Sequence, residues 1–184
     1  MLKKILIGLG ALLVAFVAFV STRPGTFRIE RSARIDAPPG VVFAQVNDFH
    51  AWEAWSPWAK LDPNMKATYA GPASGVGASY AWAGNDEVGE GKMTLTESRA
   101  PQKVGIRLEF LKPFEATNTT EFTFTPSGAT TDVVWSMQGT NNFVSKLMGV
   151  FVDMDAMIGA DFEKGLASLK QVSEAQKPAE VALP

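Results

Sequence analysis

The sequence has no cysteine and only one histidine, His50, among its 184 residues. Disulfide bonds and thiolate chemistry are therefore excluded. A metal centre built from several imidazole or thiolate ligands is excluded for the same reason. The glycines of "GPASGVG" and "GEG" do not form a phosphate loop of the type GxxxxGK[ST], and they are typical of turns and bulges. We expect no metal ion and no cofactor.

Positive charge is scarce beyond the first residues of the chain. Residues 1–23 contain Lys3, Lys4 and Arg23 and no acidic residue, so the remainder carries 14 basic and 19 acidic residues, a net charge of −5. Binding to nucleic acid requires a basic stripe that neutralises phosphates. No such run is present in the sequence, and nucleic acid is not an expected partner.

What the chain does contain is a long apolar run, "ILIGLGALLVAFVAFV", which covers residues 5–20 without a charge. As a helix it reaches roughly 24 Å, somewhat less than the roughly 30 Å hydrocarbon core of a bilayer. The polar Ser21 and Thr22 extend it, and the two preceding lysines can snorkel. We interpret residues 1–23 as a single-pass anchor in the cytoplasmic membrane.

Two alternatives bear on this segment. A cleaved signal peptide, followed by secretion of the domain, requires a small-x-small cleavage site, and "AFVAFVST" offers only a poor one. The lysines before the run favour a cytoplasmic N-terminus and a domain on the periplasmic or extracytoplasmic side. Arginines just beyond the run favour the opposite orientation. They lie, however, in a predicted strand of the folded domain, and we expect that domain to be exported regardless of its charge.

Residues 24–65 predict one strand followed by two short helices. "TFRIERSARIDA" alternates between apolar and polar residues, as a strand with one buried face does. Pro38 and Pro39 suit a first helical turn, and the apolar spacing after them predicts a helix over residues 39–47. The segment "NDFHAWEAWSPW" at 47–58 places three tryptophans in seven positions. We expect a second short helix there, ended by Pro57.

The rest of the chain predicts six strands and one helix. From residue 64 the apolar period is two, and the runs are "MKATYAG", "GASYAWAGN", "GKMTLTES", "KVGIRLEFL", "ATNTTEFTFTP" and "TDVVWSMQG". Their spacing leaves little room for crossover helices and favours an antiparallel meander. Apolar residues three and four apart predict one long helix over about 142–171. We expect a domain over residues 24–172 and a disordered tail over 173–184.

The fold class is therefore α+β, with a curved seven-stranded antiparallel sheet wrapped on the long C-terminal helix. One helix about 10 Å wide cannot fill the concavity of such a sheet, and the short helices cover only one end. We infer a gap between sheet and helix; the alternative is a solid core. Asn118 and Tyr80 are the polar residues that we expect to face this gap. A buried polar group requires a hydrogen-bond partner, and a ligand in the gap is one such partner. The predicted lining comprises Trp55, Trp58, Tyr80, Trp82, Met93, Leu108, Phe110, Asn118, Phe122, Trp135, Met137, Phe151 and Met154.

Four stretches resemble a known family: "RSARIDAPPGVVFAQVNDFHAWEAWSPW", "GVGASYAWAGNDEVGEGKMT", "DVVWSMQG" and "DFEKGLASLK". They are similar to the polyketide cyclase/dehydrase-like branch of the SRPBCC superfamily of START-like proteins, over roughly residues 26–172. The resemblance implies a helix-grip fold with a deep hydrophobic cavity. Members bind lipids, sterols, polyketides or other apolar molecules, and some are cyclases or dehydratases. No catalytic residue is carried over.

Three functional hypotheses follow. The favoured one is a membrane-anchored, non-catalytic module that binds an apolar small molecule or lipid. The second is a cyclase- or dehydratase-like enzyme, in which His50, Tyr80 or Asn118 assists. The third is a protein-interaction module that docks through an apolar patch around the tryptophans; its partner is not indicated by the sequence.

Overall fold

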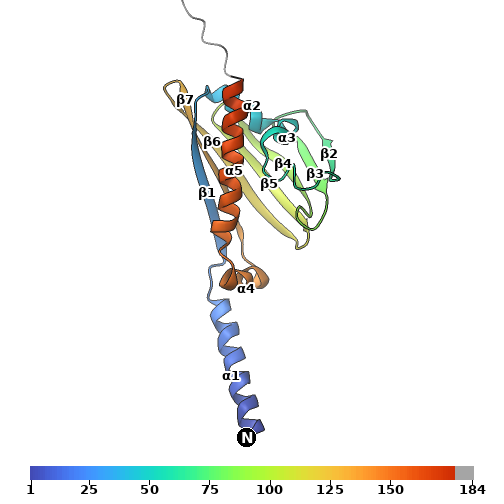
Figure 1. Ribbon diagram of the computed structural model, residues 1–184, viewed down its shortest axis with the longest axis vertical. Helices are drawn as coiled ribbons and strands as arrows, with labels where there is room; N and C mark the ends of the chain where they lie inside the picture. The colour runs from blue at the N-terminus through green and yellow to red at the C-terminus, as the bar shows by residue number, and fades with distance from the viewer. Residues whose placement is uncertain (177–184) are drawn as a thin grey trace, which may run out of the picture.

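The computed structural model describes residues 1–176 and consists of a sheet, a set of covering helices and a projecting N-terminal helix (Figure 1). Helix α1 (Leu2–Ser21) extends away from the domain and is long and apolar enough to cross a membrane, with only 6% of its most apolar window buried. The part of the predicted tail at 177–184 lies outside the described residues.

The sheet has the predicted seven antiparallel strands, in the order β1-β7-β6-β5-β4-β3-β2. Apart from β1, every strand pairs with its neighbour in the chain, which is the meander that the short turns predict. Strand β1 closes the far edge by pairing with β7. The strands are β1 (Thr26–Ile35), β2 (Lys66–Ala70), β3 (Ser79–Ala83), β4 (Glu90–Arg99), β5 (Lys103–Lys112), β6 (Ala116–Ser127) and β7 (Thr130–Thr140).

The short helices between β1 and β2 have the predicted places. Helix α2 (Pro39–Asn47) is followed by the 3₁₀ turn η1 (Phe49–Ala51) and by α3 (Trp52–Trp55). The indole N–H groups of Trp52 and Trp55 donate to the carbonyls of Val46 and Gln45, each at 3.0 Å. Carbonyls in the last turn of a helix have no intrahelical partner. The tryptophan-rich segment therefore caps the C-terminal end of α2, and it also supplies apolar side chains to the core.

The prediction of a single helix over 142–171 is wrong at one point. Helix α4 (Phe143–Phe151) and helix α5 (Met154–Ala175) are separated at Val152, whose backbone is extended. The Asp153 carboxylate accepts a hydrogen bond from the Ala156 N–H and begins α5 as an N-cap. The apolar spacing continues across this break, which is why periodicity alone predicted one helix.

Helix α5 crosses the concave face of the sheet (Figure 1) and is held close to it at two glycines. A Cβ on Gly165 would lie 2.7 Å from Trp135 Cζ3, so only glycine allows this approach. At Gly159 the Arg31 guanidinium passes against the helix, and it pairs with Asp155 and Glu163 at 3.0 Å each. These contacts confirm the α+β arrangement of a sheet wrapped on a C-terminal helix.

Candidate ligand-binding site

The concave face of the sheet is organised in rows that cross the strands. Strand register places Tyr80, Met93, Leu108 and Asn118 directly opposite one another on β3, β4, β5 and β6. Neighbouring strands lie about 4.8 Å apart, so this row spans roughly 14 Å from Tyr80 to Asn118. The sequence predicted all four as inward-facing, and the fold brings them together.

Burial changes sharply from one row to the next. The row nearer to α2 is closed, with each member at most 5% exposed: Leu95, Ile106, Thr120, Met137 and Ile29. On the other side, Tyr80, Met93 and Leu108 are half-buried, and so are Trp82 and Phe110 in the row beyond. We call these five side chains the open floor. The helices thus seal one half of the concave face and leave the other half accessible.

The sealed half is filled by aromatic rings. The Trp135 indole is stacked between Phe162 of α5, at 4.1 Å, and Phe122 of β6, at 4.8 Å. Trp55 and Trp58 meet Trp135 edge-on, with ring centroids 5.8 and 5.9 Å away. Of the predicted lining, Trp55, Phe122, Trp135 and Met137 lie in this packed core, and Trp58 is half-buried at its margin. Their contact with a ligand stays a prediction.

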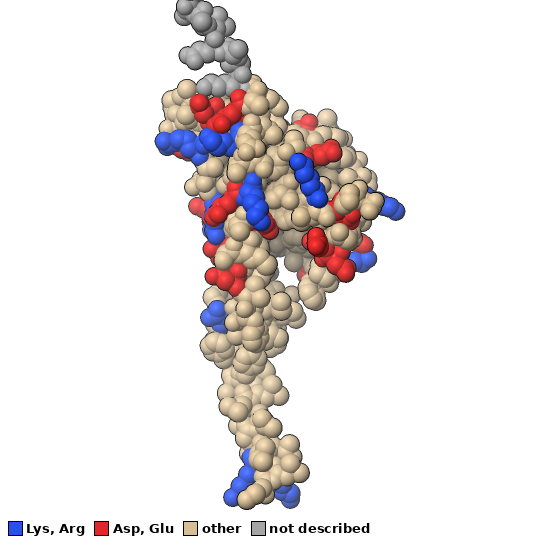
Figure 2. All heavy atoms as spheres, viewed as in Figure 1, with Lys and Arg blue, Asp and Glu red and all other residues tan. Residues whose placement is uncertain are grey.

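The open floor is an ordered aromatic surface. Trp82 donates its indole N–H to the Val88 carbonyl at 2.9 Å. Its ring covers Gly91, where any Cβ would collide with it. Tyr80 is stacked against Trp82 at 5.9 Å, and Phe110 meets Trp82 edge-on at 6.1 Å. Figure 2 shows an indentation on this side of the molecule, between the column of α4 and α5 and the lobe of strands.

Polar atoms with incomplete hydrogen bonding lie beside this floor. Asn118 is 7% exposed, and within residues 1–176 its amide nitrogen lies 3.8 Å from the Met137 sulfur, which is a weak acceptor. In residues 1–176 the Thr120 hydroxyl and the Trp135 indole N–H are buried without a partner. Buried polar groups in native proteins are normally paired with protein or water. Thr120 was missed by the sequence analysis, although it shares parity with Asn118 and Phe122.

Tyr80 carries a hydroxyl that stays neutral over the ordinary pH range. Burial is the main cause, with smaller contributions from Tyr69 and Glu53, and together they raise the pKa of Tyr80 to about 12. Its hydroxyl lies 4.0 Å from the Met65 sulfur, a weak acceptor. At neutral pH Tyr80 can therefore donate a hydrogen bond to a polar group on the floor, but it cannot act as a base.

His50 lies beyond one edge of the floor and is separated from Tyr80 by Tyr69, whose ring centroid is 5.2 Å from that of Tyr80. Its ring stacks on Tyr69 at 4.1 Å, its Nδ1 lies 2.9 Å from Asp48 Oδ1, and its side chain is 55% exposed. It lines an open hollow of about 300 Å³ with Tyr69 and the turn that begins at Gly71. Strands β3, β4 and β5 separate this edge of the sheet from Asn118. The three residues considered for catalysis are thus not brought to one point.

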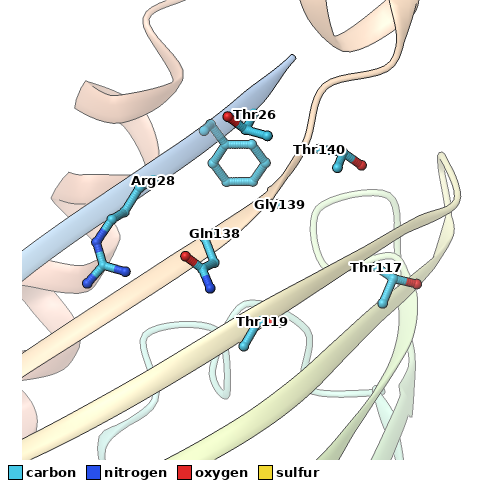
Figure 3. A pocket seen from close by; sticks show the side chains of 8 residues that line it. Thr26, Arg28, Thr117, Thr119, Gln138, Gly139 and Thr140 are labelled. Carbon is cyan, nitrogen blue, oxygen red and sulfur yellow. The ribbon is translucent and has the colours of Figure 1, made fainter. Parts of the chain in front are cut away.

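A second open hollow, of about 520 Å³, lies on the outer face of the sheet (Figure 3). Arg28, Gln138 and Thr119 are opposite one another on β1, β7 and β6, and all three are exposed. Because successive residues of a strand point to opposite faces, these three side chains lie on the face opposite to that of Asn118 and the floor. The remaining lining is also rich in threonine, so this hollow suits polar groups and does not match the predicted apolar site.

Two predicted lining residues lie beyond the sheet. Phe151 on α4 is 72% exposed, and Met154 in the first turn of α5 is also exposed. The helix break at Val152 is the reason, because it changes the direction of the chain between them. The tryptophans do not form an exposed patch either, since Trp52 and Trp55 are both buried.

A seven-stranded antiparallel sheet curved around α5, with an apolar floor at one end, defines the helix-grip class of proteins. Residues 26–174 match the family described as polyketide cyclase / dehydrase and lipid transport. The match covers most of the chain, and the protein belongs to this family, as the resemblance to the SRPBCC superfamily predicted. A search of curated proteins finds no match.

Several solved structures share the fold. An uncharacterized protein from Rhizobium leguminosarum is similar over 82% of this chain and 96% of its own, with TM-score 0.60 and 13% identity. The Aha1 protein of Colwellia psychrerythraea, solved as a dimer, is similar over 80% and 96%, with TM-score 0.58 and 16% identity. DynU16, from the dynemicin biosynthetic locus, is similar over 82% and 48%, with TM-score 0.55 and 16% identity. Family and fold point to a hydrophobic ligand or a polyketide-cyclase-like role.

Proposed function

We propose that the protein binds an apolar small molecule or lipid on the open floor, while α1 anchors it to a membrane. The observation that carries the proposal is the half-covered row from Tyr80 to Asn118, with apolar side chains between two polar ends. Ligand sites in proteins are mostly apolar, with a few polar groups that set orientation. The floor has this composition.

The polar atoms narrow the ligand class. The Trp135 indole N–H can only donate, and the Thr120 hydroxyl can donate or accept. Both lack a partner in the described residues; Thr120 lies in the row next to Asn118, whereas Trp135 lies one row further, inside the sealed half. A ligand with a hydrogen-bond acceptor, such as an ester or ketone oxygen on a hydrocarbon body, suits the Thr120 hydroxyl, which is the nearer of the two to the floor. Covering about 300 Å² of apolar surface contributes roughly 7 kcal/mol before the cost of association is subtracted.

The membrane part of the proposal rests on α1. Its 20 helical residues correspond to about 30 Å, the thickness of a hydrocarbon core. The lysines at its start favour a cytoplasmic N-terminus and an extracytoplasmic domain. A binding domain held at the bilayer surface can exchange apolar molecules without carrying them far through water.

Two neighbouring residues of β5 test the floor, because they point to opposite faces of the sheet. Leu108→Gln places an amide on the floor, whereas Arg107→Gln makes the same side chain on the outer face, where Arg107 is exposed. Full-length protein in mild detergent is titrated with a fluorescent fatty-acid probe. We expect a loss of affinity of about tenfold for Leu108→Gln and no change for Arg107→Gln. Equal affinity of both variants and wild type would place the site elsewhere.

The identity of the natural ligand is tested separately. Native mass spectrometry of the full-length protein, extracted in the same detergent, is expected to show a co-purified apolar molecule in wild type. The adduct is expected to be depleted in Leu108→Gln and retained in Arg107→Gln. Chemical conversion of that molecule during incubation would instead favour the second hypothesis, a cyclase- or dehydratase-like enzyme, in which Tyr80 and Asn118 orient a substrate along one row.

A further inference from the structure

Helix α4 presents an apolar stripe that the domain does not cover. Val144, Met148 and Phe151 are spaced as i, i+4 and i+7, so they share one face of the helix. Phe143 and Val152 flank them, and the five side chains are between 36% and 72% exposed. Monomeric soluble proteins rarely leave such contiguous apolar surface uncovered, and it commonly marks an interaction site.

The position of α4 identifies what covers this stripe. Phe151 lies against Phe16 of α1, with ring centroids 6.5 Å apart. The Lys146 ammonium group donates to the Ser21 carbonyl at 3.3 Å, at the last residue of α1. Just before α4, the Asn141 side chain donates to the Pro24 carbonyl at 3.2 Å. Helix α4 is therefore fastened to the end of α1 nearest the domain.

A membrane-spanning α1 sets the depth of everything fastened to its end. Its 20 residues match the hydrocarbon thickness of about 30 Å, so Ser21 falls at the boundary between acyl chains and headgroups. Helices with a strongly apolar face lie in this plane, with that face among the acyl chains. Figure 2 shows that the charged groups gather on the upper lobe and at the N-terminal tip, while the region of α1 and α4 is almost free of them.

We propose that α4 is an interfacial helix, and that its exposed apolar face inserts into the lipid bilayer that α1 crosses. This inference rests on the membrane anchoring in the proposed function. It adds a second contact with the membrane, which fixes the orientation of the domain on the bilayer surface. A single spanning helix cannot fix that orientation, because the domain could rotate and tilt about the connection at residues 22–25.

A second group of exposed apolar side chains lies at the end of the sheet that is nearest to α4. Leu111 and Phe114, at the turn between β5 and β6, are 55% and 67% exposed. Register places this turn beside the end of β7 that leads into α4, because Asn118 is opposite Gly139. Figure 1 shows the end of this hairpin and α4 on the side of the domain that faces α1. With α4 on the bilayer, this turn, which ends strand β5 of the open floor, is also directed toward lipid.

Site-directed labelling tests the depth of α4 directly, because the natural chain has no cysteine. Val144→Cys, at the N-terminal end of the stripe, is labelled with an environment-sensitive fluorophore. Ser145→Cys is the matched control, one residue and 100° further around the helix. Leu12→Cys, in the middle of α1, reports on the anchor. Each full-length variant is reconstituted in phosphatidylcholine vesicles with brominated acyl chains, which quench only fluorophores in the hydrocarbon region.

We expect strong quenching at Leu12, quenching at Val144 at least twofold greater than at Ser145, and the reverse order with aqueous iodide as quencher. Quenching at Leu12 with none at Val144 overturns the interfacial placement of α4 and leaves the anchor intact. Absence of quenching at both positions overturns the anchor as well as the inference. Probe binding by wild type and Leu108→Gln is independent of these outcomes, so failure of the ligand site is detected separately.

Discussion

The Asn118 side-chain oxygen lies directly over Gly139, its partner across β6 and β7, in the space that a Cβ at position 139 would occupy. Phe27 Cε1 bounds the same space at 2.9 Å from that Cβ position. Glycine at this position therefore makes room for the polar end of the row that begins at Tyr80. The placement of Asn118 depends on a residue that carries no side chain of its own.

Gly139→Ala is expected to displace Asn118 and to lower the free energy of unfolding by about 1–3 kcal/mol, as overpacking of a filled space does. Urea denaturation measures this loss. Gly40→Ala is the control, because nothing lies within 4 Å of a Cβ there and alanine favours the helical conformation. A Gly139→Ala variant as stable as wild type, with unchanged probe affinity, would show that Asn118 is free to move.

Thr120→Val removes a buried hydroxyl while keeping the shape of the side chain. Since this hydroxyl lacks a partner within residues 1–176, its removal is expected to raise the free energy of unfolding of the ligand-free protein by about 1 kcal/mol. Affinity for a probe with a carbonyl group is expected to fall, and affinity for a plain hydrocarbon probe to stay the same. A loss of stability in the ligand-free protein would mean that Thr120 is already paired.

The two tyrosines are expected to ionise at unusually high pH. Burial raises the pKa of Tyr80 to about 12 from its ordinary value of 10.0, and burial also raises the pKa of Tyr69. The neutral form of Tyr80 is therefore the one that the fold favours. Its contribution to stability is complete below pH 10, the value for the unfolded chain, and is lost as the pH rises toward 12.

Ultraviolet absorbance of tyrosinate, with circular dichroism to follow unfolding, checks this alkaline behaviour. In Tyr80→Phe the titration step near pH 12 is expected to disappear, leaving that of Tyr69. A bound apolar ligand on the floor is expected to shift the Tyr80 step further upward, because it removes remaining water from the hydroxyl. Ionisation of both tyrosines at pH 10 in the folded protein would contradict the burial of Tyr80.

The strands and their inward residues could be predicted because side-chain parity is a local property. Alternation in "KVGIRLEFL" is sufficient to put Leu108 and Phe110 on one face. The row itself could not be predicted, since the alignment of Tyr80, Met93, Leu108 and Asn118 depends on the pairing of four strands. Register comes from long-range contacts that no single strand encodes.

The division of the concave face into a sealed and an open half was also beyond prediction. Alternation along the strands places Trp135 and Trp82 alike, as inward aromatic residues. In the structure Trp135 is stacked between Phe122 and Phe162, whereas Trp82 remains half-buried. The difference depends on where α5 and α3 cover the sheet. The break at Val152 had one local signal, Asp153 as an N-cap, but the continuing apolar spacing outweighed it.

The sealed row from Leu95 to Met137 closes one side of the open floor. The floor extends over two rows, and rows on one face are about 7 Å apart along the strands. A long hydrocarbon chain therefore meets a barrier after a short distance and cannot thread through the domain. A protein built in this way can grip such a chain by one end and must leave the rest outside.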